Sequence, residues 1–355
     1  MTEATLETPA PAALTSLSLT RCPAVPTASA LAYQLGYLQE EFADEPGLDT
    51  QFKSIGFTGK LDYAHHERLW VRNAGHAPAV WAKSNGVDNK VVALAWLKGS
   101  YPLLSLRGSG IDSPAELKGK RLALIGNHEA SFDLLIAQQL KIYSATLATV
   151  GLTLDDVELV RISKPSIPAA AAGAPKKDHF VELARVLVAR LILGDVEVIS
   201  ARLPAEVAAF ADVQTLYDLH EHSDPRARVH PSVLRGLVVS RALLEERRDI
   251  VVRYLARLLQ ATEWAAAHPE EAAELVAQDL GVPVGNLLAS YDSVSDGLQL
   301  RLDDDIVDSL RVQKDFLLAH GFIDKDFDFA SWVDQTPLQE ARHLLAQWKA
   351  AGKLA

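Results

Sequence analysis

The residue with the clearest capacity for chemistry is Cys22, because it is the only cysteine of the chain. It follows a β-like run at residues 17–21 and precedes residues 23–26, where two prolines forbid a continuous helix and predict a tight turn. A helix is expected over residues 28–42. A thiol between a strand end and a helix start, beside Arg21, has surroundings that favour a nucleophilic thiolate. The alternative is a small, buried, inert side chain.

Polar groups also follow two other predicted strands. Asn127 and His128 lie between a strand and a long helix, so His128 is expected either to donate to an anion at the helix N-terminus or to be a solvated loop residue. Ser200 and Arg202 stand at the end of another strand, where open α/β sheets collect their ligands. All four residues are therefore candidates for ligand binding.

The sequence predicts neither a metal nor any other cofactor. His65 and His66 are adjacent, so their rings point in different directions and cannot easily share an ion. The acidic run at residues 303–305 lacks the further oxygen ligands of a calcium loop. A helix N-terminus, which acidic residues stabilise, explains that run better.

Size and charge limit the classes of partner. The 355 residues suggest two domains, and the formal charge of −11 makes nucleic acid an unsuitable partner. A single cysteine excludes an internal disulfide. The sequence contains no run of 18 or more apolar residues, so it predicts no membrane span. Residues 1–13 have neither the basic nor the apolar region of a secretory signal and are expected to be a disordered arm. We expect a cytoplasmic protein, or a periplasmic one if the N-terminus is truncated.

The remaining sequence alternates strands and helices, which indicates an α/β protein with parallel sheets. Strands are predicted over residues 91–97, which are expected to be buried, and over residues 102–107, 122–125 and 194–200. Residues 154–162 are predicted to be a helix-end turn followed by a strand. Helices are predicted over residues 131–150 and 180–192, and the part from residue 241 to 348 is expected to be mainly helical.

Several motifs resemble known families. Residues 110–124 (GIDSPAELKGKRLAL) resemble a crossing segment of the type II periplasmic-binding-protein fold, which sulfonate-binding and nitrate-binding proteins share. Residues 20–26 (TRCPAVP), 72–78 (RNAGHAP) and 154–165 (LDDVELVRISKP) resemble the aromatic sulfinate desulfinase family, which has the same fold. This second resemblance recurs from about residue 17 to residue 323.

The desulfinase resemblance implies roles for individual residues. It implies that Cys22 is the catalytic cysteine, that Arg72 is the active-site arginine, and that the backbone N–H of Gly75 helps to bind the sulfinate. A guanidinium suits this group because its planar fork of donors matches two oxygens that share one negative charge. Arg21 is a further candidate for substrate binding.

One position departs from the family pattern. The family has an active-site histidine ten residues before the arginine, and this chain has Asp62 there. Either His65 or His66 takes over the role, or the chemistry is altered or lost. We predict that His65 does so, with Asp62 orienting or charging its imidazole.

Together these features predict a two-lobed, type II periplasmic-binding-protein-like α/β fold with a ligand cleft. Lobe I is expected to contain residues 14–107 and 213–355, and lobe II residues 108–212. The predicted function is cysteine-dependent hydrolysis of a C–S bond, releasing sulfite from an organic, aromatic sulfinate. The alternative is a non-catalytic solute-binding protein for a sulfonate or a small aromatic anion. In both cases the partner is a small anionic organosulfur ligand, and the protein is expected to be a monomer.

Overall fold

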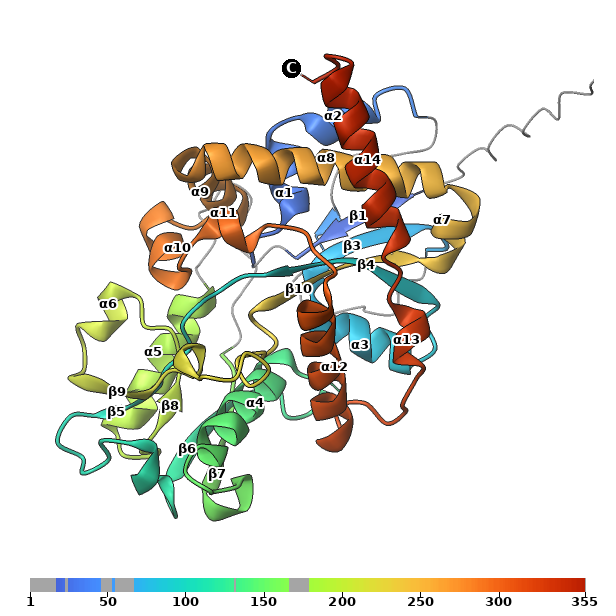
Figure 1. Cartoon of the computed structure of the whole chain (residues 1–355). Helices are drawn as coiled ribbons and strands as arrows, with labels where there is room; N and C mark the ends of the chain where they lie inside the picture. Colours follow the sequence, from blue (N-terminus) through green and yellow to red (C-terminus); the bar gives the residue numbers. More distant parts are fainter. Residues whose placement is uncertain are drawn as a thin grey trace, which may run out of the picture.

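A five-stranded sheet forms the centre of the larger lobe (Figure 1). The computed structural model describes residues 17–22, 25–45, 53–54, 67–130, 132–165 and 179–354. The strand order is β2-β1-β3-β10-β4. β1 is parallel to β2 and β3, whereas β10 is antiparallel to β3 and β4. The strands are β1 (Ser18–Arg21), β2 (Lys53–Ser54), β3 (Trp70–Gly75), β4 (Asn89–Trp96) and β10 (Leu234–Ser240).

Helices cover both faces of this sheet. Figure 1 shows α1 and α8 on one side and α3 and α12 on the other. One large apolar core joins these layers and includes the fully buried Trp332. The helices of this lobe are α1 (Ala28–Gln34), α2 (Tyr37–Glu41), α3 (His76–Ser84), α7 (Arg241–Glu246), α8 (Arg248–Ala267), α9 (Pro269–Leu280), α10 (Val284–Ser290), α11 (Val294–Gly297), α12 (Asp304–Ala319), α13 (Phe329–Trp332) and α14 (Thr336–Ala350).

The smaller lobe has its own sheets and two apolar cores. Its strands form the orders β8-β5-β9 and β6-β7, and the backbone N–H of Ala123 on β6 donates to the carbonyl of Val198 beside β8. α5 contributes to one core and α4 to the other. The elements are β5 (Leu103–Leu106), β6 (Arg121–Gly126), α4 (Leu134–Ala148), β7 (Glu158–Ser163), α5 (His179–Ile192), β8 (Ile199–Ser200), α6 (Ala205–Ala208) and β9 (Val213–Tyr217), with short 3-10 turns at Pro114–Leu117, Leu154–Asp156 and Leu219–Glu221.

The chain crosses between the lobes at residues 97–102 and 218–233, which separate β4 from β5 and β9 from β10. We expected the boundaries after residues 107 and 212. The difference arises because β5 pairs with both β8 and β9, so these strands belong to the smaller lobe. The predicted arm at residues 1–13 lies outside the described residues.

Two expected helices differ from the observed ones for local reasons. The helix predicted over residues 28–42 is two helices, because Gly36 between them has a φ of +80°, a conformation that favours glycine. The helix expected from residue 131 begins at Leu134, because the carboxylate of Asp133 accepts from the N–H groups of Leu135 and Ile136 and caps it.

The strand predicted over residues 194–200 is also shorter than expected, since only Ile199 and Ser200 form β8. Among the residues that the structure describes, no helix is long and apolar enough to cross a membrane.

Candidate functional site

Strand pairing places Cys22 next to the end of β3. Thr20 on β1 is level with Arg72 on β3, and the N–H of Cys22 donates to the carbonyl of Asn73 at 3.1 Å. Neighbouring strands lie ~4.8 Å apart and rise ~3.3 Å per residue, so the Cα atoms of Cys22 and Arg72 are roughly 8 Å apart. Two side chains and a small ligand can bridge that separation. The Cys22 side chain is partly exposed.

Arg72 is held in the middle of the sheet. It is only 6% exposed and pairs with Thr20 on one side and with Val238 of β10 on the other. Because alternate residues of a strand face opposite sides of the sheet, Arg72 and Arg21 project from different faces. The backbone of Arg72 is therefore held by strand pairing on both sides.

Gly75 marks the change from β3 to α3, which begins at His76. Its φ of −54° is accessible to any residue, and a Cβ built on it would meet only the carbonyl oxygen of Pro231, at 3.7 Å. The fold therefore does not require glycine here. Its missing side chain leaves open the approach to backbone N–H groups at the start of a helix.

We expect Gly75→Ala to fold with the stability of the parent, because the added methyl group fits at ordinary contact distance. The same methyl group should obstruct an anion that approaches the N–H of Gly75, so the Kd for a sulfinate should rise roughly 10-fold or more. Thermal melting and calorimetric titration measure the two effects. Equal affinity in both proteins would remove Gly75 from the binding site.

The histidine that follows is a residue that sequence reasoning missed. His76 is 1% exposed, with Nδ1 2.9 Å from the carbonyl oxygen of Leu234 and Nε2 3.2 Å from Oε1 of Gln313. It thereby ties the start of α3 to β10 and α12. Burial lowers the pKa of His76 from 6.5 to about 4, so the ring is neutral at pH 7.

This shift predicts a pH dependence of stability. Because the unfolded chain binds a proton at His76 below pH 6.5 and the folded chain does so only near pH 4, acidification through this window should remove up to about 3 kcal/mol. Urea unfolding measures the free energy of unfolding at pH 7 and at pH 4.5. The loss of this free energy between the two pH values should be smaller for His76→Gln than for the parent. The exposed His268 provides the control, since His268→Gln should leave the difference unchanged.

Arg21 has a structural partner instead of an open position. Its Nη2 lies 2.6 Å from Oδ1 of the buried Asp279 on α9, which Gln34 of α1 also contacts. We expected Arg21 to bind substrate. Its guanidinium instead joins β1 to α9, on the face opposite Arg72.

The predicted anion position at Asn127 and His128 is already served by a carboxylate of the protein. The N–H of Asn127 donates to Oδ2 of Asp133 at 2.9 Å, and Lys164 lies 3.8 Å from the same oxygen. Nε2 of His128 lies 3.0 Å from the carbonyl oxygen of Leu124, and Oδ1 of Asn127 accepts from the N–H of Glu129. Asp133 thus uses the donors that we expected a ligand to use.

Ser200 and Arg202 lie where the lobes meet. Ser200 is buried opposite Leu103 on β5. The Arg202 guanidinium stacks between Tyr101 of the first crossing segment and Tyr291 of the larger lobe, at 4.1 and 4.3 Å from the ring centroids. Its Nε donates to the carbonyl of Ser100 at 3.0 Å. Arg202, which follows β8 of the smaller lobe, therefore contacts both the first crossing segment and the larger lobe.

Asp62, His65 and His66 lie outside the described residues, so their predicted roles remain predictions. Among the described residues, no group of three or more His, Cys, Asp or Glu side chains could hold a metal ion.

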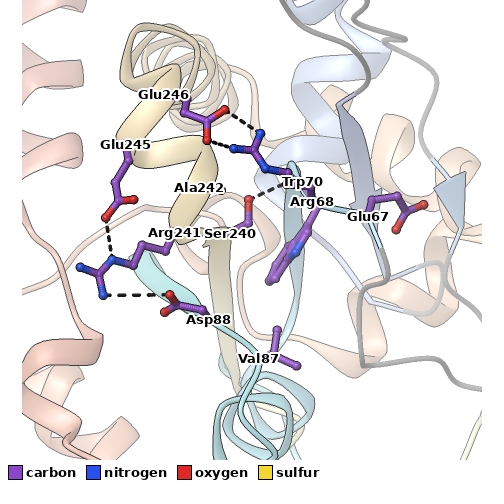
Figure 2. Close-up of a pocket in the computed structure, with 10 residues that line it drawn as sticks. All are labelled: Glu67, Arg68, Trp70, Val87, Asp88, Ser240, Arg241, Ala242, Glu245 and Glu246. Carbon is purple, nitrogen blue, oxygen red and sulfur yellow. Dashed lines mark hydrogen bonds and ion pairs between the residues drawn. The ribbon is translucent and has the colours of Figure 1, made fainter.

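A hollow of about 420 Å³ lies at the other end of the sheet (Figure 2). Trp70 and Ser240, at the start of β3 and the end of β10, line it. Its charged side chains pair with one another, as Figure 2 shows for Arg68 with Glu246 and for Arg241 with Glu245. We assign it no chemistry because both of its arginines already form ion pairs with carboxylates.

Comparisons with known proteins agree with the sequence resemblance. No protein-family model matches the chain. The 2'-hydroxybiphenyl-2-sulfinate desulfinase of Rhodococcus erythropolis is 27% identical over 353 residues, which cover 90% of this chain and 91% of the relative.

Two solved structures share the fold. A cysteine-to-serine mutant of DSZB in complex with biphenyl-2-sulfinic acid has a TM-score of 0.70 at 23% identity and covers 93% of this chain and 99% of its own. The periplasmic aliphatic sulphonate binding protein SsuA of Escherichia coli has a TM-score of 0.62 at 15% identity, over 90% and 92% of the two chains. The predicted fold class is thus confirmed. The chain resembles the sulfinate desulfinases over nine-tenths of its length and has the periplasmic-binding-protein-like fold that they share with sulfonate-binding proteins.

Proposed function

We propose that this chain is a cysteine-dependent hydrolase that releases sulfite from an organic, aromatic sulfinate. The observation that carries the proposal is the strand register that sets Cys22 beside Arg72 and close to Gly75. The similarity to a named desulfinase supports it. A sulfinate-bound structure of a related cysteine mutant supports the class of ligand.

Two routes use these groups. In the first, the Cys22 thiolate attacks the sulfinate sulfur, an S–S bond forms, the C–S bond breaks, and the aryl carbon takes a proton. Water then releases sulfite and restores the thiolate. In the second, the Cys22 thiol protonates the aryl carbon and water attacks sulfur. Both routes consume one water, yield the arene and sulfite, and need no oxidant or reductant.

Arg72 and the N–H of Gly75 hold the sulfinate oxygens in this scheme. The guanidinium supplies two parallel donors, and the glycine supplies a third that no side chain obstructs. Fixing the oxygens also fixes the sulfur, so the thiolate meets it in one orientation.

The test is incubation with a panel of aryl and alkyl sulfinates, with measurement of released sulfite. We expect release from at least one aryl sulfinate. Calorimetric titration with the same sulfinates and with the matching sulfonates measures binding; if several of them bind and no sulfinate is cleaved, the chain is a solute-binding protein instead. The fold shared with SsuA is the observation that supports this second candidate. A cytoplasmic location remains a prediction that cell fractionation can test.

A further inference from the structure

Two further arginines, the buried Arg235 and the partly buried Arg202, lie near the segment that carries Cys22. Arg235, on β10, is level with Gly75 on β3 and is only 3% exposed. A small cavity of about 10 Å³ separates it from Thr27 and Asn73. Asn73 is the residue whose carbonyl accepts from Cys22, so this cavity adjoins the segment that carries the thiol.

Apart from the hydroxyl of Tyr291, the acceptors that the Arg235 guanidinium has in the described part of the chain are carbonyl oxygens. Its Nη2 donates to Ser232 at 2.7 Å, and its Nη1 lies 3.5 Å from Pro231 and 3.4 Å from Leu234. Its Nε has no hydrogen-bond partner among the described residues. The charge of this side chain is therefore buried without a carboxylate.

Arg202 approaches the same place from the smaller lobe. Its Nη2 also lacks a hydrogen-bond partner within the described ranges, and no carboxylate there forms an ion pair with it. The carboxylate of Asp218 influences Arg202 only from a distance and bonds instead to Ser100. Two cations thus converge without a matching acid, an arrangement that is costly unless an anion joins them.

Tyr291 is 7% exposed, its ring centroid lies 4.3 Å from the Arg202 guanidinium carbon, and its hydroxyl forms hydrogen bonds with both Arg202 and Arg235. Burial raises the pKa of Tyr291, but the charges of Arg202 and Arg235 outweigh burial and leave it lowered. His230 cannot supply negative charge, and burial together with the same two arginines lowers its pKa and keeps it neutral. The tyrosine hydroxyl is thus the group that both cations share.

We propose that Arg235 and Arg202, with the hydroxyl of Tyr291, form a second oxyanion-binding subsite next to the Cys22 site. This inference rests on the proposed function for its ligand class. The oxyanion is either a second acidic group on the sulfinate, such as a carboxylate, or the released sulfite. Arg72 holds the reacting sulfinate, and the second subsite selects ligands or retains product.

Calorimetric titration with three probes tests the subsite: benzenesulfinate, 2-carboxybenzenesulfinate and inorganic sulfite. The variants are Arg235→Met, which keeps the length but removes the charge, and Tyr291→Phe, which removes only the hydroxyl. Arg107→Met is the matched control, because Arg107 is an exposed arginine of the smaller lobe. Thermal melting checks that each variant is folded.

If the subsite takes a second acidic group, the carboxylated sulfinate should bind the parent more tightly, and Arg235→Met should weaken it roughly 10- to 100-fold with little change for benzenesulfinate. If it takes product, the affinity for sulfite should fall by a similar factor. Tyr291→Phe should move the same probe in the same direction, and it decides the case if Arg235→Met does not fold. Unchanged affinities for both probes in the folded variants overturn the proposal. Sulfite release is measured separately, so a catalytically inactive chain contradicts the proposed function and leaves the binding result standing.

Discussion

Cys22→Ser should abolish sulfite release from aryl sulfinates, with turnover falling roughly 10³-fold or more. A serine hydroxyl is far less ionised than a thiol at neutral pH, so it neither attacks sulfur nor protonates carbon as readily. Ligand binding should persist, because Arg72 and the N–H of Gly75 are unchanged. Sulfite assays and calorimetric titration of the same preparation separate the two effects.

Cys22→Ala serves as the control for packing, because it removes the polar atom as well. If serine and alanine variants both lose ligand affinity along with turnover, Cys22 contributes to structure and not to chemistry. Alkylation by iodoacetamide, followed by intact mass, also checks that the thiol is accessible, and bound benzenesulfinate should slow that reaction.

Arg72→Ala should raise the Kd for an aryl sulfinate roughly 10- to 100-fold, the ~1.5–3 kcal/mol expected for a hydrogen bond to a charged group. Arg72→Lys should recover only part of this, because an ammonium cannot reproduce the two parallel donors of a guanidinium. Titration of all three proteins with benzenesulfinate gives the comparison.

Because Arg72 lies within the sheet, unfolding has to be separated from lost binding. Urea unfolding of each variant identifies any that is not folded. The lysine variant keeps the charge and most of the length of the side chain, so it is the variant that we expect to retain the fold. A folded Arg72→Lys protein with the affinity of the parent would show that a two-pronged contact is absent.

The local features of the fold were predictable from the sequence. The strands at 91–97, 102–107 and 122–125 appear as β4, β5 and β6, because continuous apolar runs bounded by turn residues specify buried strands. Helix starts were harder to place. Asp133 fixes one through a side-chain contact that hydrophobic periodicity does not register.

The candidate site was predictable only where a motif carried it. Cys22, Arg72 and Gly75 came from the desulfinase resemblance, and the β1–β3 pairing places them together. Arg235 and Tyr291 belong to no such motif. Arg235 lies on β10 and Tyr291 directly follows α10, so their proximity depends on how these two elements pack, which local sequence does not encode.

Arg21 shows the same dependence on contacts that are distant in sequence. Its neighbour Cys22 suggested a reactive setting, but its partner Asp279 is 258 residues away along the chain. A charged residue near a nucleophile therefore needs its long-range partner before it can be assigned to a ligand.

The position of β10 in the larger sheet has a consequence for how the protein is made. β3 and β4 are consecutive in sequence, yet β10 lies between them and is synthesised only after the whole smaller lobe. Until it arrives, a growing chain presents two unpaired strand edges, and such edges promote association with other chains. Contacts of this sequence separation also form slowly. Truncation before residue 234 should therefore yield an aggregating product in which Arg72 and Gly75 lack their partner strand β10. The demand for chaperones should fall sharply once β10 has emerged from the ribosome.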